Sequence, residues 1–320
     1  MMQSKHGKYE TAIDKELKLI HRQEESLRRA AMKGKTPQWK TALEEKVPGS
    51  IYENLQKAFR KAFAIVFEKG TGLIEKTYNR ESLEEDCQVR EFAFQVKANR
   101  KTLKKARKDA RAGNLRNLAI TSAEGIGLGV LGIGLPDIVM FVGVLLKGIY
   151  ETALQYGYAY DSDQERCFIL KLMETAVLKG EDWEEGNREI DRYIESSAVE
   201  CAVEEESGTE ESGEEEPGAE ESGEEEFEAE GPGEQQQSET WEKDLRERVK
   251  EQTGRTADAF AMDMVLLKFV QGLPVVGILG GAGNPLYYNK VIKYAELKYR
   301  KRYLLKLREK FRSQQDPGKM

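Results

Sequence analysis

The chain has 320 residues, 39% of them hydrophobic and 33% charged, which allows one large or two ordinary globular domains with a highly charged surface. The net charge of −7 averages two different regions: residues 204–230 hold 15 Glu and no Lys or Arg, so removing those 15 negative charges leaves +8 for the remainder. Three widely spaced cysteines (Cys87, Cys167 and Cys201) argue against a disulfide scaffold and a cysteine-based zinc site, and residues 1–25 lack the apolar run of a secretory signal.

The N-terminal region predicts one loosely held helix followed by a well-specified one. Residues 1–37 are expected to form a mobile, charged helix or tail that packs loosely or not at all. Ser50 and Glu53 form a capping-box pattern, in which each side chain accepts a hydrogen bond from a backbone N–H at a helix start. The helix that follows has one apolar face, formed by Leu55, Phe59, Ala62, Phe63 and Val66.

Further helices follow the same signals. Capping boxes at Ser82–Glu85 and Ser162–Glu165 predict two more starts, and residues 183–202 predict a helix after Gly180. The helix from Ser82 is expected to run through the apolar residues Val89, Phe92 and Val96, and then through a basic second half that ends at Gly113-Asn114. The last helix, over residues 291–311, is very basic but has an apolar series at four-residue steps, Val291, Ala295, Tyr299, Tyr303 and Leu307.

The acidic region is a low-complexity insert over residues 203–240. Residues 204–213 and 214–223 are near-copies with a period of ten. Such a segment has little to bury and its like charges repel, so it is predicted to be a disordered linker between two parts of one domain. The predicted divisions are therefore 1–37, 38–202, 203–240, 241–312 and 313–320.

Two apolar, glycine-rich segments each contain a Gly-Leu-Pro sequence. The first, residues 125–146, is long enough to cross a bilayer core, which takes about 20 residues. Pro136 and Asp137 lie at its middle, where a carboxylate costs on the order of 3 kcal/mol. We therefore expect a break at this proline and a hairpin of two short helices, with Asp137 capping the second. The second segment, residues 271–283, is expected to fold likewise around Pro274.

These hairpins are open to two interpretations: the buried centre of a soluble helical domain, or a region that dips into a bilayer. Basic stretches at residues 97–116 and 290–312 flank them and favour an anionic membrane surface, where each Lys or Arg gains about 1 kcal/mol. The candidate membrane-contact residues are Leu128, Leu131, Leu135, Val139, Phe141, Leu273, Val275 and Ile278. The candidate basic surface residues are Lys104, Lys105, Lys108, Arg300, Lys301 and Arg302.

No motif in the chain predicts a cofactor or metal site. Residues 127–132 fit the GxGxxG pattern, but no strand–helix–strand alternation accompanies them, so no nucleotide site is expected. Only two histidines, His6 and His21, are present, which argues against a histidine-based metal centre or triad, and the basic helices lack a nucleic-acid-binding motif. The candidates for a carboxylate-based hydrolase, which is the alternative function, are Asp137, Glu124 and Asp263.

Several segments resemble the bacterial EcsC protein family over residues 38–200 and 241–308. The segments are Ser-Ile-Tyr-Glu at 50–53, Lys-Gly-Thr-Gly-Leu-Ile-Glu-Lys-Thr-Tyr at 69–78, Leu-Pro-Asp at 135–137, Tyr-Glu-Thr-Ala-Leu-Gln-Tyr-Gly at 150–157, and Pro-Leu-Tyr-Tyr-Asn-Lys at 285–290. The family is named from a gene beside an ABC transporter. The resemblance therefore implies a cytoplasmic protein at the inner face of the cell membrane, beside a transporter, and it supplies no catalytic residues.

The predicted fold is all-α, a helical bundle around two glycine-rich apolar hairpins with a disordered acidic insert. The expected function is that of a non-enzymatic, membrane-associated accessory protein, peripheral at the inner face of the membrane. Its expected partners are an anionic membrane surface or a membrane protein such as an ABC transporter subunit, and not nucleic acid. A hydrolase and a purely soluble interaction module are the alternatives.

Overall fold

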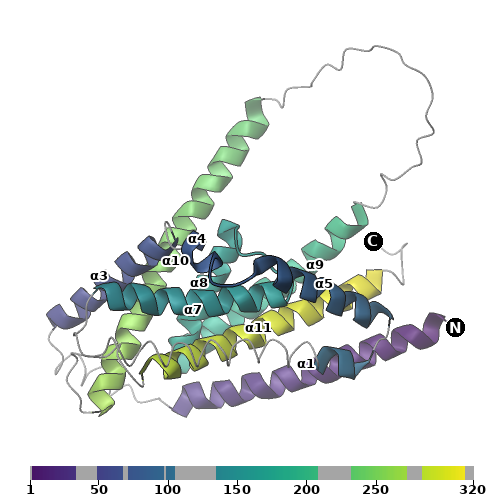
Figure 1. Ribbon diagram of the computed structural model, residues 1–320, viewed down its shortest axis with the longest axis horizontal. Coiled ribbons are helices and arrows are strands. Elements are labelled where there is room, and N and C mark those ends of the chain that lie inside the picture. Colours follow the sequence, from purple (N-terminus) through teal and green to yellow (C-terminus); the bar gives the residue numbers. More distant parts are fainter. Residues whose placement is uncertain are drawn as a thin grey trace.

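The computed structural model describes residues 2–33, 49–67, 71–96, 99–104, 135–207, 232–271 and 283–313. Within these ranges the chain forms α-helices and no strand, so the predicted all-α class is confirmed (Figure 1). The helices are α1 (Met2–Lys33), α3 (Gly49–Ile65), α4 (Thr71–Glu75), α5 (Arg80–Val96), α7 (Leu135–Gln155), α8 (Asp163–Val177), α9 (Gly180–Ser207), α10 (Pro232–Gln271) and α11 (Gly283–Ser313).

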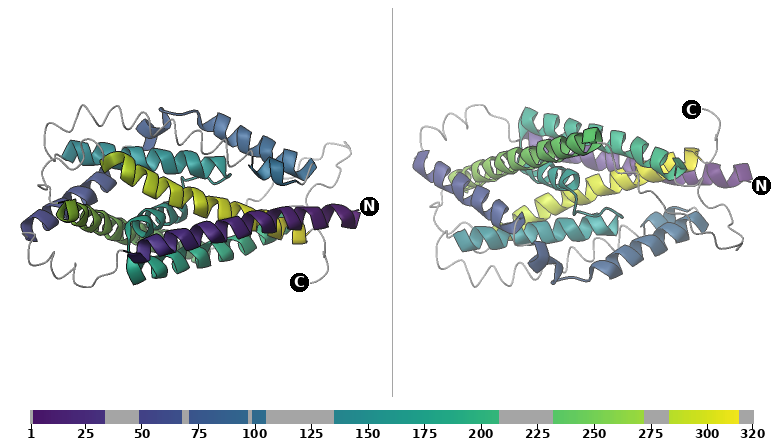
Figure 2. Two further views of the ribbon diagram at one scale, coloured as in Figure 1. Left: turned by 90° about the horizontal axis from the view of Figure 1, so that it is seen from below. Right: turned by 90° about the horizontal axis from the view of Figure 1, so that it is seen from above.

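The helices on both sides of the acidic insert build one bundle. Helix α11 contacts α1, α7, α8 and α9, and α10 contacts α3 and α8. Figure 2 shows α11 running through the middle of the bundle, with α1 along one side and α7 along another. The buried hydrophobic residues of all these helices belong to a single core cluster, so neither part of the chain has a core of its own.

The apolar faces predicted for α3 and α11 are the faces that pack into the core. All five residues of the α3 series and all five of the α11 series are buried. At α8 the serine half of the predicted capping box is confirmed, because the Ser162 side chain accepts a hydrogen bond from the Glu165 backbone N–H. The Glu165 carboxylate instead accepts from Tyr299 and Arg302 of α11.

At α5 the capping prediction is wrong, because Asn79 Oδ1 accepts from the Ser82 N–H and the helix begins one turn earlier than expected. The helix also ends at Val96 and residue 99 is not helical, so the expectation of one long helix to Gly113 is wrong.

Helix α1 packs firmly, so the expectation of a loosely held N-terminal helix is wrong. Ile13 and Ile20 are buried, as is the charged Glu16, which pairs with Arg100 at 2.8 Å. The helix lies against α9 and α11. Its charged residues suggested a solvated segment, but several of them pair with charged residues of the helices that it covers.

Pro136 lies at the start of helix α7. The helix begins at Leu135, so the proline lies in its first turn, where the missing N–H breaks no helical hydrogen bond. Asp137 is the third residue of the helix and not its cap. The predicted second arm of the first hairpin is thus a helix of 21 residues, while residues 125–134 and 272–282, with Pro274, lie outside the described part of the chain.

The described helices include one stretch, Ile138–Gln155, that is long and apolar enough to span a membrane. Within the bundle 72% of that stretch is buried, which is the environment of a core helix. The observation favours the soluble-centre interpretation for this part of the first apolar segment.

The edges of the acidic insert are helical. Helix α9 continues to Ser207 and α10 begins at Pro232, so the predicted disordered segment of residues 203–240 is too long at both ends. Glu and Gln are good helix formers, and proline suits the first position of a helix. The acidic repeats between residues 208 and 231 lie outside the described residues.

Two glycines of α7 allow a paired test of its packing against α11. A Cβ added at Gly148 would lie 2.6 Å from the Tyr288 hydroxyl and 2.8 Å from Ile292 Cδ1, whereas one at Gly143 would have no neighbour within 4 Å. Both glycine-to-alanine changes gain similar helix propensity, but overpacking costs about 1–3 kcal/mol. We expect Gly148→Ala to be less stable than Gly143→Ala by that amount in urea unfolding. Equal stabilities would show that Tyr288 and Ile292 move aside without cost.

Candidate functional site

Three basic residues of α11, Lys298, Arg300 and Arg302, are buried inside the bundle. Arg300 and Arg302 are only 4% and 8% exposed, so the prediction that they form a basic surface is wrong. Lys301 is half-buried. Among the other predicted basic contacts, Lys104 is exposed, and Lys105 and Lys108 lie outside the described residues.

Lys298 joins three helices through ion pairs. Its side chain is fully buried, and its Nζ lies 2.6 Å from Glu24 of α1 and 2.6 Å from Asp191 of α9. Lys301, one turn further along α11, lies 2.9 Å from the same Asp191 carboxylate. Burial opposes the charge of Lys301, but the carboxylates of Glu24 and Asp191 raise its pKa above the ordinary value.

Arg302 makes a second buried pair. Its Nη1 donates to Glu165 at 2.7 Å, and the Tyr299 hydroxyl donates to the other oxygen of that carboxylate at 2.6 Å. The guanidinium lies 4.1 Å from the centre of the Tyr158 ring, with further aromatic rings around it. Burial, together with the neighbouring carboxylate, raises the pKa of Tyr299 well above its ordinary value. The arrangement holds α11 to the start of α8.

Asp263, one of the three carboxylates considered for catalysis, is also held in an ion-pair cluster. Its oxygens lie 2.7 Å from Lys179 Nζ and 3.3 Å from Lys290 Nζ. Burial lowers the pKa of Lys290, and Asp263 opposes this shift; burial and Asp263 together raise the pKa of Tyr287. Two ammonium groups around a carboxylate are typical of a structural ion pair. The candidate Glu124 lies outside the described residues.

The part of the chain that the structure describes contains no group of three His, Cys, Asp or Glu side chains able to hold a metal ion.

The two glycine-rich segments join the bundle at the same end. Phe141 near the start of α7 lies 5.9 Å, centroid to centroid, from Tyr287 near the start of α11, and 6.1 Å from Phe260 of α10. The first segment continues into α7, which begins at Leu135, and the second connects α10 to α11. The starts of α7 and α11 and the end of α10 therefore meet at one end of the bundle, the left end in Figure 1, which we call the apolar end.

Large apolar side chains are exposed at the apolar end. Met140 of α7 is 44% exposed and Leu286 of α11 is 60% exposed. Of the predicted membrane-contact residues, Phe141 is buried, so this prediction is wrong, and Val139 is half-buried against the core. Leu135 is the first residue of α7. The remaining candidates, outside the described residues, are Leu128, Leu131, Leu273, Val275 and Ile278.

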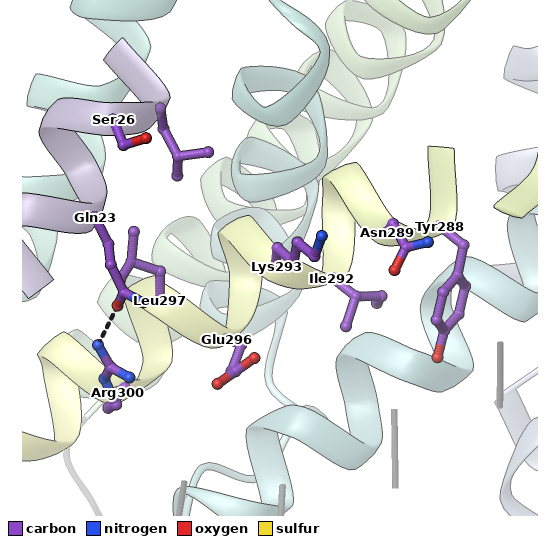
Figure 3. A pocket seen from close by; sticks show the side chains of 10 residues that line it. Gln23, Ser26, Tyr288, Asn289, Ile292, Lys293, Glu296, Leu297 and Arg300 are labelled. Atoms are coloured by element: carbon purple, nitrogen blue, oxygen red, sulfur yellow. Dashed lines mark hydrogen bonds between the residues drawn. The ribbon is translucent and has the colours of Figure 1, made fainter. Parts of the chain in front are cut away.

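A groove of about 410 Å³ lies between α1 and α11 (Figure 3). The two helices run in opposite directions and separate towards the C-terminal end of α1 (Figure 2). The groove, called here the α1–α11 groove, is lined by Gln23, Ser26, Leu27, Tyr288, Asn289, Ile292, Lys293, Glu296, Leu297 and Arg300. Arg300 donates a hydrogen bond to the Gln23 side chain at one end. Sequence reasoning missed this groove, and the only signal for it was the polar series at positions 289, 293, 296 and 300.

Comparison with known proteins places the chain in one family. No curated protein and no solved structure matches it. The family model matches nearly the whole described bundle, including most of α1, which the sequence resemblance had left out. The chain belongs to the EcsC protein family, whose model matches residues 12–304.

Proposed function

We propose that this protein is a non-enzymatic accessory protein that binds the inner face of the cell membrane through its apolar end. The observation that supports the proposal is that both glycine-rich apolar segments join the bundle where Met140 and Leu286 are exposed. Exposed apolar side chains gathered beside apolar segments are typical of a membrane or protein contact. The family's link to a transporter gene makes an ABC transporter subunit the protein neighbour in this proposal.

Basic side chains on α3 support the same orientation. Lys57 and Lys61 are exposed one turn apart, on the helix whose Phe59 joins the aromatic cluster of the apolar end at 6.3 Å from Phe141. Arg60, between them, pairs with Asp258 at 2.7 Å. Exposed lysines near an anionic leaflet gain about 1 kcal/mol each. They replace the α11 arginines as the basic residues of the proposed membrane contact.

A soluble interaction module is the second candidate. It is favoured by an apolar stripe on α5, where Val89, Phe92 and Val96 are 66%, 65% and 58% exposed. Spacings of three and four residues place them on one face of the helix, and that face points away from the core. The hydrolase alternative is weakened because Asp263 is held between two lysines.

Liposome flotation tests the membrane proposal. The full-length protein is expected to float with vesicles that contain phosphatidylglycerol. Met140→Asp and Leu286→Asp should each lower the partition coefficient about tenfold or more, because burying one such side chain contributes about 1.5–3 kcal/mol. Phe92→Asp is the matched control, since it removes an exposed apolar residue from α5, whose Phe94 packs on Phe311 at the opposite end of α11. Salt-sensitive flotation would indicate surface binding, and salt-resistant flotation would indicate insertion.

Two results would contradict this assignment. Absence of flotation by the wild-type protein would leave the soluble interaction module as the better description. Equal losses in Phe92→Asp and Leu286→Asp would show that the apolar end has no special role.

A further inference from the structure

We propose that the α1–α11 groove binds a small amphipathic monoanion, in which a carboxylate or phosphate head group is carried on an apolar chain. The proposal concerns the chemistry of the ligand, whether it comes from a lipid or is a free acid, and it stands whether or not the apolar end binds membranes. It rests on the charge, the shape and the lining of the groove.

The charges that line the groove favour an anion. Lys293, Glu296 and Arg300 share one face of α11 at spacings of three and four residues. Among the described lining residues, two cations and one carboxylate leave one excess positive charge. A guanidinium presents a fork of N–H donors that matches a carboxylate or a phosphate.

Two of these three charged groups are buried, which indicates a built site and not a solvated surface. Glu296 and Arg300 are 6% and 4% exposed, yet both side chains line a cavity. Arg300 is oriented by its hydrogen bond to Gln23 of α1, so the position of the guanidinium depends on both walls of the groove.

The rest of the lining favours a ligand with an apolar body. Leu27, Ile292 and Leu297 supply aliphatic surface from both helices, and Ser26 and Asn289 add polar groups at the edges. A volume of about 410 Å³ lies within the range of about 300–1,000 Å³ that small-molecule sites occupy. From Tyr288 to Arg300 the α11 floor is roughly 18 Å long, at 1.5 Å per residue, which suits an extended chain better than a compact ring.

The position of the groove gives such a ligand a route of entry. Tyr288 lies two residues after the exposed Leu286, so the groove starts beside the apolar end and leads inward to Arg300. Figure 3 shows the lining side chains spread along this line, with Arg300 and Tyr288 at opposite ends. The apolar chain of the ligand would lie along Ile292 and Leu297, and its head group would lie near Lys293 or Arg300.

Isothermal titration of the full-length protein with decanoate, below its micelle concentration, tests the proposal. Decanoate is expected to bind, and decanol, which lacks the charge, to bind at least tenfold more weakly. Acetate and inorganic phosphate, which lack the chain, should not compete. Wild-type protein that does not bind decanoate, or binds decanol equally well, would overturn the proposal.

Variants locate the binding in the groove. Ser26 is exposed on α1, so Ser26→Trp should fill the groove without disturbing the core and weaken decanoate binding at least tenfold. His21→Trp places the same side chain on an exposed position of α1 that does not line the groove, and should bind like wild type. Lys293→Gln should weaken binding a few-fold. Equal affinities of the two tryptophan variants would show that decanoate binds elsewhere.

Vesicle competition separates the two natural sources of such a ligand. Displacement of decanoate by phosphatidylglycerol vesicles, but not by phosphatidylcholine vesicles, would identify a membrane lipid as the source, and lack of displacement would identify a free acid. Leu286→Asp should keep its decanoate affinity even where flotation is lost, so failure of the membrane proposal would not be mistaken for failure of this one.

Discussion

Glu165→Ala is expected to lower the free energy of unfolding by about 3–5 kcal/mol, because removing one partner of a buried ion pair leaves the other charge uncompensated. Glu165 is 4% exposed, and its two oxygens accept from Arg302 and Tyr299. The alanine variant would leave the Arg302 guanidinium among aromatic rings with no carboxylate at 2.7 Å. Urea unfolding followed by circular dichroism measures the change.

Two comparisons show whether the pair is responsible. Arg28→Ala removes pairs between side chains that are 31–48% exposed, and should cost no more than about 1 kcal/mol. The double variant Glu165→Leu with Arg302→Met replaces both charges by apolar groups and should recover most of the loss, because buried pairs are often no better than well-packed hydrophobic residues. If the double variant lost as much stability as the single variants Glu165→Leu and Arg302→Met added together, the pairing of the two charges would not explain the loss.

Lys298→Met is expected to cost a similar amount, about 3–5 kcal/mol, and to loosen α1 in particular. Methionine keeps the length of the side chain but leaves Glu24 and Asp191 facing each other with only Lys301 between them. Because Glu24 belongs to α1, the repulsion acts between α1 and the rest of the bundle. Hydrogen exchange of the α1 amides should therefore speed up more than that of the α8 amides.

The matched control is Lys293→Met, which removes an exposed lysine from the same helix. That variant should leave the α1 exchange rates close to wild type. Equal protection of α1 in the two variants would show that the Lys298 pairs do not hold the helix in place.

The helices of this bundle could be predicted wherever the pattern of apolar residues was regular. In α11 the series from Val291 to Leu307 identified the core face, and every member is buried. Charged residues between them were assigned to the surface, because a lysine or arginine usually lies in water. The sequence could not show that Lys298, Arg300 and Arg302 are buried, since their partners come from three other helices.

The candidate sites depend on contacts that no local pattern encodes. Arg300 and Gln23 form part of the α1–α11 groove although 277 positions separate them in the chain. The apolar end likewise requires the starts of α7 and α11 to meet. The error at α5 is more local: Asn79 and Ser82 both have capping side chains, and the structure uses the first of them.

The packing of α1 against α11 limits the order in which the chain can fold during synthesis. Glu24 and its partner Lys298 are 274 positions apart, so the ribosome, at about 5–20 residues per second, needs roughly 14–55 s to make the second after the first. Throughout that interval Ile13, Ile20 and Glu16 have no completed surface to dock on. Docking of α1 on α11 therefore waits until α11 has been synthesised, and in that interval the apolar face of α1 is open to chaperones.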